Sequence, residues 1–177
     1  MSKLAPCPSA KEQALREKNY QAVKAYMELE GVGHHEERLA LCTEDVFFEV
    51  VSTKECLPER VVGKNKLRRR FLETEKFWAK YTYTNIEIIP TQYPETFFVE
   101  CDAEGLIVNP MFSEPHPYKN YYMILFNVES GLIRDIRQFT NPMNLYHSFW
   151  KTLPDNIYGT GAGAYGGLKE AIAMAKF

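Results

Sequence analysis

The sequence has no long apolar run, no strong excess of charge and no closely spaced cysteines. No stretch approaches the roughly 18 apolar residues that a membrane-spanning helix needs, so we expect neither a membrane partner nor a secretory signal. The formal net charge of −2 argues against a protein that binds nucleic acid through phosphate attraction. None of the four cysteines forms a C-x-x-C pair, which predicts reduced thiols in a cytoplasmic protein and no zinc site.

The sequence also lacks the short motifs of several large enzyme classes. It contains no glycine-rich dinucleotide or phosphate loop, no nucleophile elbow and no H-E-x-x-H. Aromatic residues, in contrast, are plentiful, with 11 Tyr, 11 Phe and 2 Trp among 177 residues. So many rings in one small domain indicate either a thick core or the lining of a hollow.

The order of sequence patterns predicts three helices around one early strand, followed by four strands. Helical spacing of apolar residues covers 9–30, 34–43, 63–81 and 142–150. Strand patterns cover 46–51, 83–89, 96–108, 118–128 and 132–139, and a loop is expected over 52–62. This order predicts the α+β class, with helices packed on one face of a curved sheet. One such architecture is a cone with a deep apolar pocket between helix and sheet.

Two local signals define where these elements begin and turn. Ser9 and Glu12 fit a capping box that opens the first helix. Gly131, after Glu129 and Ser130, predicts a tight hairpin turn before the last strand.

The composition changes near residue 150. We expect residues 1–150 to form a single domain, followed by a glycine-rich tail over 151–177. The segment Gly159–Gly167 has the composition of a flexible linker, and Leu168–Phe177 could form a short amphipathic helix. Such a tail is either disordered or docked on a partner subunit.

The helix predicted over 63–81 carries the first candidate site residues. Its apolar stripe includes Thr74 and Trp78, and Arg70 lies beside that stripe, whereas Arg69 points away. On the pocket side, the guanidinium of Arg70 could hold a substrate carboxylate in a bidentate grip. The alternative is a solvated basic face, or a pair between Arg70 and a structural glutamate.

The strand predicted over 96–108 places three carboxylates on one face, those of Glu100, Asp102 and Glu104. Carboxylates so close together could raise the pKa of one of them and supply a general acid, for which Asp102 is the candidate. More often such a face is wet or meets basic residues of a neighbouring strand.

Two later strands add polar candidates. Tyr118 and Tyr121 lie on opposite faces of one strand, and tyrosine hydroxyls either donate to a developing oxyanion or belong to a protein interface. Gln138 lies near the end of the last strand and can face the pocket. Its amide donates and accepts hydrogen bonds but cannot transfer a proton as a carboxyl does.

The order of elements resembles the superfamily of nuclear transport factor 2 and ketosteroid isomerase. More specifically, residues 10–150 resemble the phenazine-biosynthesis A/B protein family. The segments that carry this resemblance are Gly63–Leu67, Phe98–Asp102, Tyr118–Asn120, Phe126–Arg134 and Arg137–Asn141. The resemblance implies a conical, curved, mixed sheet wrapped around three N-terminal helices, a fold also described as SnoaL-like. It also implies a homodimer formed through the sheet, and secondary metabolism, including antibiotic biosynthesis.

The resemblance further implies cofactor-free chemistry on a small cyclic carboxylate. In that family two molecules of an aminocyclohexenone carboxylate condense, amine onto ketone, and the protein gains most from holding them together. Active members carry a Glu in the final strand and a His and a Ser on the third helix, where this chain has Gln138, Arg70 and Thr74. Tyr118 and Arg38 match family positions that contact the ligand.

These departures leave three hypotheses. The first is a phenazine-type condensing enzyme, weakened by the loss of the acid/base Glu. In it Arg70 or Arg38 holds the carboxylate, Tyr118 and Gln138 orient the reacting groups, and Thr74 assists. Asp102 is the reserve acid, while Tyr121 and Trp78 contribute to substrate binding. The second is an isomerase, dehydratase or cyclase for another metabolite. The third is a non-catalytic ligand-binding or dimer-partner subunit.

Overall fold

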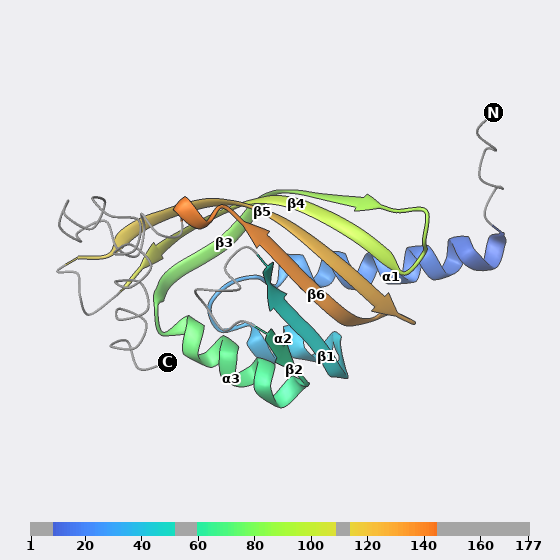
Figure 1. Cartoon of the computed structure of the whole chain (residues 1–177), viewed down its shortest axis with the longest axis horizontal. Coiled ribbons are helices and arrows are strands. Elements are labelled where there is room, and N and C mark those ends of the chain that lie inside the picture. The colour runs from blue at the N-terminus through green and yellow to red at the C-terminus, as the bar shows by residue number, and fades with distance from the viewer. Residues whose placement is uncertain (1–8, 52–59, 109–113, 145–177) are drawn as a thin grey trace, which may run out of the picture.

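A computed structural model describes residues 9–51, 60–108 and 114–144 of the chain (Figure 1). The described helices are α1 (Ala10–Glu28), α2 (His35–Ala40) and α3 (Lys64–Glu75). The described strands are β1 (Cys42–Val50), β2 (Arg60–Val62), β3 (Trp78–Pro90), β4 (Thr96–Ile107), β5 (His116–Glu129) and β6 (Leu132–Thr140).

The strands form one six-stranded mixed sheet in the order β2-β1-β6-β5-β4-β3. Strands β3 to β6 make a consecutive antiparallel meander, while β1 pairs in parallel with β6 and antiparallel with β2. The sheet arches over the helices: α1 packs against β3, β5 and β6, and α3 packs against β1, β2 and β3 (Figure 1). The predicted α+β class, with a curved mixed sheet around N-terminal helices, is confirmed.

Both turns at one end of the sheet are tied to α1. The capping box of Ser9 and Glu12 begins this helix, as predicted. Two turns further along, the buried Asn19 donates from Nδ2 to the Pro94 carbonyl over 3.0 Å. The Asn19 Oδ1 accepts from the Gly131 amide over 2.8 Å. One amide side chain therefore connects the helix to the β3–β4 turn and to the β5–β6 turn.

The β5–β6 connection is the tight hairpin that the sequence predicts. Glu129 pairs with Leu132 across a two-residue loop. Ser130 has a φ of 50° and Gly131 a φ of 88°, the two positive values that a type I′ turn requires.

The inner face of the sheet and the helices enclose the core. Along β4, fully buried residues alternate with partly or fully exposed ones, so Phe97 and Cys101 point inward and Phe98 outward. The same alternation along β5 buries Tyr118 and exposes Tyr121. Each strand therefore contributes to the core and to the outer surface at once.

Three predicted boundaries are wrong. Helix α3 ends at Glu75, and Trp78 begins β3, where it pairs with Ile107 of β4. The aromatic residues that follow Glu75 favour a pleated strand, and this pairing outweighs the helical spacing. Strand β1 already starts at Cys42, inside the predicted second helix. Strand β2 lies at the end of the predicted loop, where it pairs with residues 47–49.

The C-terminal predictions fall largely outside the described residues. Residues 142–144 are helical, in agreement with the start of the helix predicted over 142–150, and residues 145–150 lie outside the described residues. The tail predicted over 151–177 also lies outside the described residues. In the part of the chain that the structure describes, no helix is long and apolar enough to cross a bilayer.

Candidate functional site

A group of tyrosine hydroxyls and amides lies buried on the inner face of the sheet. Alternation along β5 turns Tyr118, Asn120 and Tyr122 inward together. The hydroxyls of Tyr118 and Tyr122 are 2.8 Å apart, and Asn120 donates from Nδ2 to the Tyr118 hydroxyl over 2.8 Å. On β3, Tyr83 accepts a hydrogen bond of 3.3 Å from Gln138 Nε2, and its ring packs edge-on against Tyr122. The partly buried Tyr81 joins them, because its ring lies 5.5 Å from that of Tyr83. We call Tyr81, Tyr83, Tyr118, Asn120, Tyr122 and Gln138 the inner polar cluster.

Burial determines what these hydroxyls can do. It raises the pKa of Tyr81, Tyr83, Tyr118 and Tyr122 above the ordinary value of a phenol. The four hydroxyls therefore stay protonated near neutral pH, where they donate and accept hydrogen bonds. They can polarise a carbonyl oxygen but are poor bases.

Trp78 joins the inner polar cluster from the first position of β3. Its ring lies 5.0 Å from that of Tyr118 and 4.6 Å from that of Tyr81, measured between centroids. Trp78 therefore lies beside Tyr118, and the sequence hypothesis assigns both residues to one site. Trp78 belongs to a strand, whereas the sequence predicted a helix at this position.

Arg70 points from α3 toward the sheet. Its guanidinium carbon lies 4.8 Å from the centre of the Phe48 ring on β1, and its electrostatic neighbours include Tyr122 and Tyr26. Burial lowers the pKa of Arg70 to about 10, which the two tyrosines partly oppose. A lowered pKa means that the charged form lacks solvation that an anionic ligand could replace.

Thr74 lies one turn beyond Arg70 and is half-buried. Its hydroxyl donates to the Arg70 carbonyl over 2.8 Å, a bond within the helix itself. The Thr74 side chain is therefore positioned by its own backbone, and its hydroxyl oxygen keeps acceptor capacity for another group.

Arg38 lies deeper in the interior and is already engaged. Only 6% of the residue is exposed, and its guanidinium carbon lies 4.2 Å from the Tyr26 ring centre and 4.8 Å from that of Phe71. It forms an ion pair with Glu30, the second residue after α1. Because that carboxylate balances its charge, Arg38 is poorly suited to hold a substrate carboxylate.

Glu30 is a functional candidate that the sequence reasoning missed. Its side chain is 12% exposed, and burial raises the pKa of its carboxyl while Arg38 opposes that rise. The residue directly precedes Gly31 and reads in the sequence as an ordinary helix end. Tyr81 and Tyr83 were also missed, although the Tyr-x-Tyr spacing at the start of their strand places both rings on one face.

Two predicted site residues lie on the other face of the sheet. Asp102 alternates with the buried Cys101 and accepts a hydrogen bond of 2.8 Å from Asn85 Nδ2. Tyr121 is 46% exposed between two buried neighbours on β5. The structure therefore does not bring Asp102 or Tyr121 together with Gln138.

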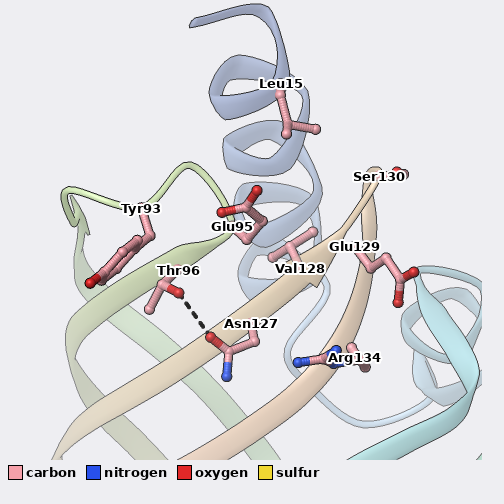
Figure 2. Close-up of a pocket in the computed structure, with 9 residues that line it drawn as sticks. All are labelled: Leu15, Tyr93, Glu95, Thr96, Asn127, Val128, Glu129, Ser130 and Arg134. Atoms are coloured by element: carbon pink, nitrogen blue, oxygen red, sulfur yellow. Dashed lines mark hydrogen bonds between the residues drawn. The ribbon is translucent and has the colours of Figure 1, made fainter. Parts of the chain in front are cut away.

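A pocket of about 320 Å³ lies at the opposite end of the sheet, between α1 and the two turns that Asn19 connects. In its lining, the Thr96 hydroxyl donates to the Asn127 side-chain oxygen over 2.9 Å, a bond that is marked in Figure 2. Its charged lining residues Glu95, Glu129 and Arg134 are exposed, and Arg134 pairs with a neighbouring carboxylate. None of the predicted site residues lines this pocket.

The described thiols are buried and unreactive. Burial raises the pKa of Cys42 to about 11 and that of Cys101 to about 12, so both stay protonated near neutral pH. Cys7 and Cys56 lie outside the described residues. Within the described ranges, no group of three His, Cys, Asp or Glu side chains is placed to hold a metal ion.

Comparison with known proteins identifies close relatives of this fold and sequence. PhzB1, a phenazine biosynthesis protein of Pseudomonas aeruginosa, is 34% identical over 130 residues, which are 72% of this chain and 77% of the relative. The crystal structure of the phenazine biosynthesis-related protein phzb2 from the same organism superposes with a TM-score of 0.72. It is 26% identical, and the match covers 82% of this chain and 93% of that one.

More distant structures share the fold. An NTF2-like protein of Burkholderia xenovorans superposes with a TM-score of 0.59 at 17% identity, over 75% of this chain and 95% of its own.

The family model for phenazine biosynthesis protein A/B matches residues 7–157, which is most of the chain. The chain therefore belongs to the phenazine biosynthesis protein A/B family and has a nuclear transport factor 2-like fold.

Proposed function

We propose that this protein binds a small cyclic amino-ketone carboxylate and promotes its imine condensation without a cofactor. The observation that carries the proposal is the arrangement of the buried side chains in a member of this family. Gln138 bonds to Tyr83 in the inner polar cluster, and Arg70 points toward the same interior from α3. A positive charge beside neutral donors suits a ligand with one carboxylate and one ketone.

Each part of this arrangement has a chemical role. Arg70 holds the carboxylate by charge-assisted hydrogen bonds, and Thr74 lies one turn away to bind a neighbouring group. The protonated hydroxyls of Tyr83 and Tyr118 polarise the ketone oxygen as the amine attacks its carbon. In the complete step the nitrogen loses two protons, the ketone oxygen leaves as water and a carbon–nitrogen double bond forms.

The direct test is the condensation rate of the aminocyclohexenone carboxylate with and without the purified protein. We expect a rate above that in buffer, and a further increase in the Gln138→Glu variant, because a carboxyl can transfer the protons that the amide cannot. No acceleration by either protein would remove the enzymatic part of the proposal.

Ligand affinity tests the role of Arg70. Loss of a charge-assisted pair in Arg70→Ala should weaken binding of the same compound roughly tenfold to a hundredfold. Arg69→Ala is the matched control, because Arg69 is an exposed neighbour on the same helix. Equal affinities for the two variants would exclude Arg70 from the ligand site.

A second candidate function rests on Gln138 itself. A buried amide at the position where the family resemblance implies a carboxyl favours a ligand-binding subunit that orients the reactants without moving protons. Tight binding without acceleration, together with a rate increase when an active family member is added, would support this function over the first.

We also propose that the protein is a cytoplasmic homodimer formed through the outer face of the sheet. Apolar side chains gather there on adjacent strands, with 39% of Phe98, 40% of Met123 and 41% of Phe139 exposed. Burying such a patch between two copies removes apolar surface from water. Sedimentation should show a dimer that dissociates in Met123→Lys. A wild-type monomer at micromolar concentration would contradict this.

A further inference from the structure

The proposed condensation needs a group that both gives and takes protons, and the inner polar cluster has none. Gln138 is an amide, and the buried tyrosine hydroxyls hold their protons near neutral pH. Asp102 lies on the outer face of the sheet. A carboxyl in the interior is therefore the missing part.

Glu30 is a carboxyl in the right region. Its side chain is 12% exposed and reaches Arg38 of α2, whose guanidinium lies against the rings of Tyr26 on α1 and Phe71 on α3. The contacts thus bring the carboxylate to the point where the three helices meet beneath the sheet. Its charge acts on Tyr81 and Tyr83 of β3 and on Cys101 of β4.

The ion pair with Arg38 is not explained by stability alone. Removing two charges from water costs several kcal/mol, and well-packed apolar residues are often as stable as a buried ion pair. An interior that keeps such a pair beside a cluster of hydroxyls is typical of a functional site. Both charges of the pair act electrostatically on Tyr83, and Tyr83 accepts a hydrogen bond from Gln138.

We propose that Glu30 is the proton-transfer group of this site and supplies the carboxyl function that Gln138 lacks. The inference rests on the proposed condensation. The Glu30 carboxylate takes a proton from the nitrogen as the amine attacks, and the resulting carboxylic acid gives that proton to the ketone oxygen. The carboxyl repeats this exchange as the hydroxyl group leaves as water, and it ends in its starting state.

The surroundings of Glu30 allow both protonation states. The titratable and charged groups that face it are Arg38 of α2, Tyr26 of α1, Glu75 of α3, Tyr81 and Tyr83 of β3, and Cys101 of β4. Burial and the charge of Glu75 raise the pKa of Glu30, and Arg38 opposes them. A raised pKa makes the carboxylate a better base for taking the proton that it then returns as an acid.

The test compares Glu30→Gln with the wild-type protein in the condensation assay. The substitution keeps the side-chain shape and a hydrogen-bond acceptor for Arg38 but removes the exchangeable proton. We expect the rate to fall about 100-fold or more while ligand affinity stays within threefold. The rate should also lose the part of its pH dependence that comes from the titration of the Glu30 carboxyl. Glu28→Gln is the matched control, because Glu28 is an exposed residue paired only at the surface with Lys24.

Rescue separates a chemical role from a structural one. Gln138→Glu should raise the rate of Glu30→Gln by at least ten times the factor by which it raises the wild-type rate, because only there does it replace a missing carboxyl. A purely structural Glu30 would give the same factor in both backgrounds. If Glu30→Gln does not fold, the double variant Glu30→Gln/Arg38→Gln removes both buried charges. Its rate is then compared with and without Gln138→Glu in the same way.

The outcomes distinguish the two proposals. An active wild-type protein with Glu30→Gln within threefold of its rate, at an unchanged pH profile, would overturn the role of Glu30 alone. A wild-type protein that binds the compound and does not accelerate condensation would overturn the proposed activity, and the role of Glu30 with it.

Discussion

The two faces of the sheet differ sharply although they are built from alternate residues of the same strands. On β5, the inward Tyr118 and Tyr122 share a buried hydrogen bond, whereas Tyr121 and Met123 between and beyond them are exposed. One face carries the proposed ligand site and the other the proposed association surface. Neighbouring residues should therefore respond to substitution in different ways.

The largest expected difference is between two adjacent phenylalanines of β4. Phe97 is fully buried and packs edge-on against Tyr20 of α1, while Phe98 is 39% exposed on the outer face. Phe97→Ala should lower the free energy of unfolding by about 3–5 kcal/mol, because it leaves a cavity in the core. Phe98→Ala should cost less than about 1 kcal/mol in the monomer. Urea unfolding at low protein concentration measures both.

Equal losses for the two variants would mean that the outer face is as well packed as the core. A selective effect of Phe98→Ala on dimer dissociation, with monomer stability retained, would instead sharpen the contrast between the faces.

The next effect concerns the charge on the inner side. The anionic ligand that we propose needs the protonated guanidinium of Arg70, whose pKa burial lowers to about 10. Below that pH Arg70 is already protonated, so binding takes up no proton and the affinity stays constant. Above it each binding event must take up one, so affinity should fall roughly tenfold per pH unit. Isothermal titration between pH 8 and 11 measures this, and the same slope in Arg70→Ala would refute the assignment.

A smaller effect is expected from two tyrosine hydroxyls. Tyr118→Phe removes a buried hydroxyl that bonds to Tyr122 and Asn120, and should cost about 1 kcal/mol of unfolding free energy. Tyr121→Phe removes an exposed hydroxyl and should leave stability unchanged within error. Thermal unfolding of the two variants in parallel shows whether the hydroxyl on the inner face contributes more to stability than the hydroxyl on the outer face.

The smallest effect belongs to the outer ion pair. Lys119 and Glu104 approach to 2.9 Å, but 78% and 51% of their side chains are exposed. Lys119→Ala should not shift the unfolding midpoint measurably, because water solvates both charges in its absence. A clear destabilisation would show that these charges lie in a surface covered by another molecule.

Local periodicity explains which parts of the site the sequence could predict. The two-residue period of a strand places Tyr118 inward, and the 100° step of a helix turns Arg70 toward the sheet. The same period sets Asp102 opposite Cys101 and Tyr121 opposite Tyr118. Applied to every strand in the same way, this alternation alone is enough to separate Asp102 and Tyr121 from Gln138.

Contacts between distant segments explain what the sequence could not predict. Trp78 continues a helical stripe in the sequence, yet its pairing with Ile107 places it in a strand. Glu30 reads as a surface residue at a helix end until the turn that follows it brings Arg38 into contact. Both outcomes depend on tertiary partners that no local pattern contains.

The parallel pairing of β1 with β6 joins two segments that lie far apart in the chain, Cys42–Val50 and Leu132–Thr140. A ribosome releases the first of these long before the second. Strand β1 must therefore wait, with one edge unpaired, until β6 has emerged, and the meander of β3 to β6 can form without it. The pairing of β1 with β6 therefore places a slow, long-range step of folding after β6 has emerged.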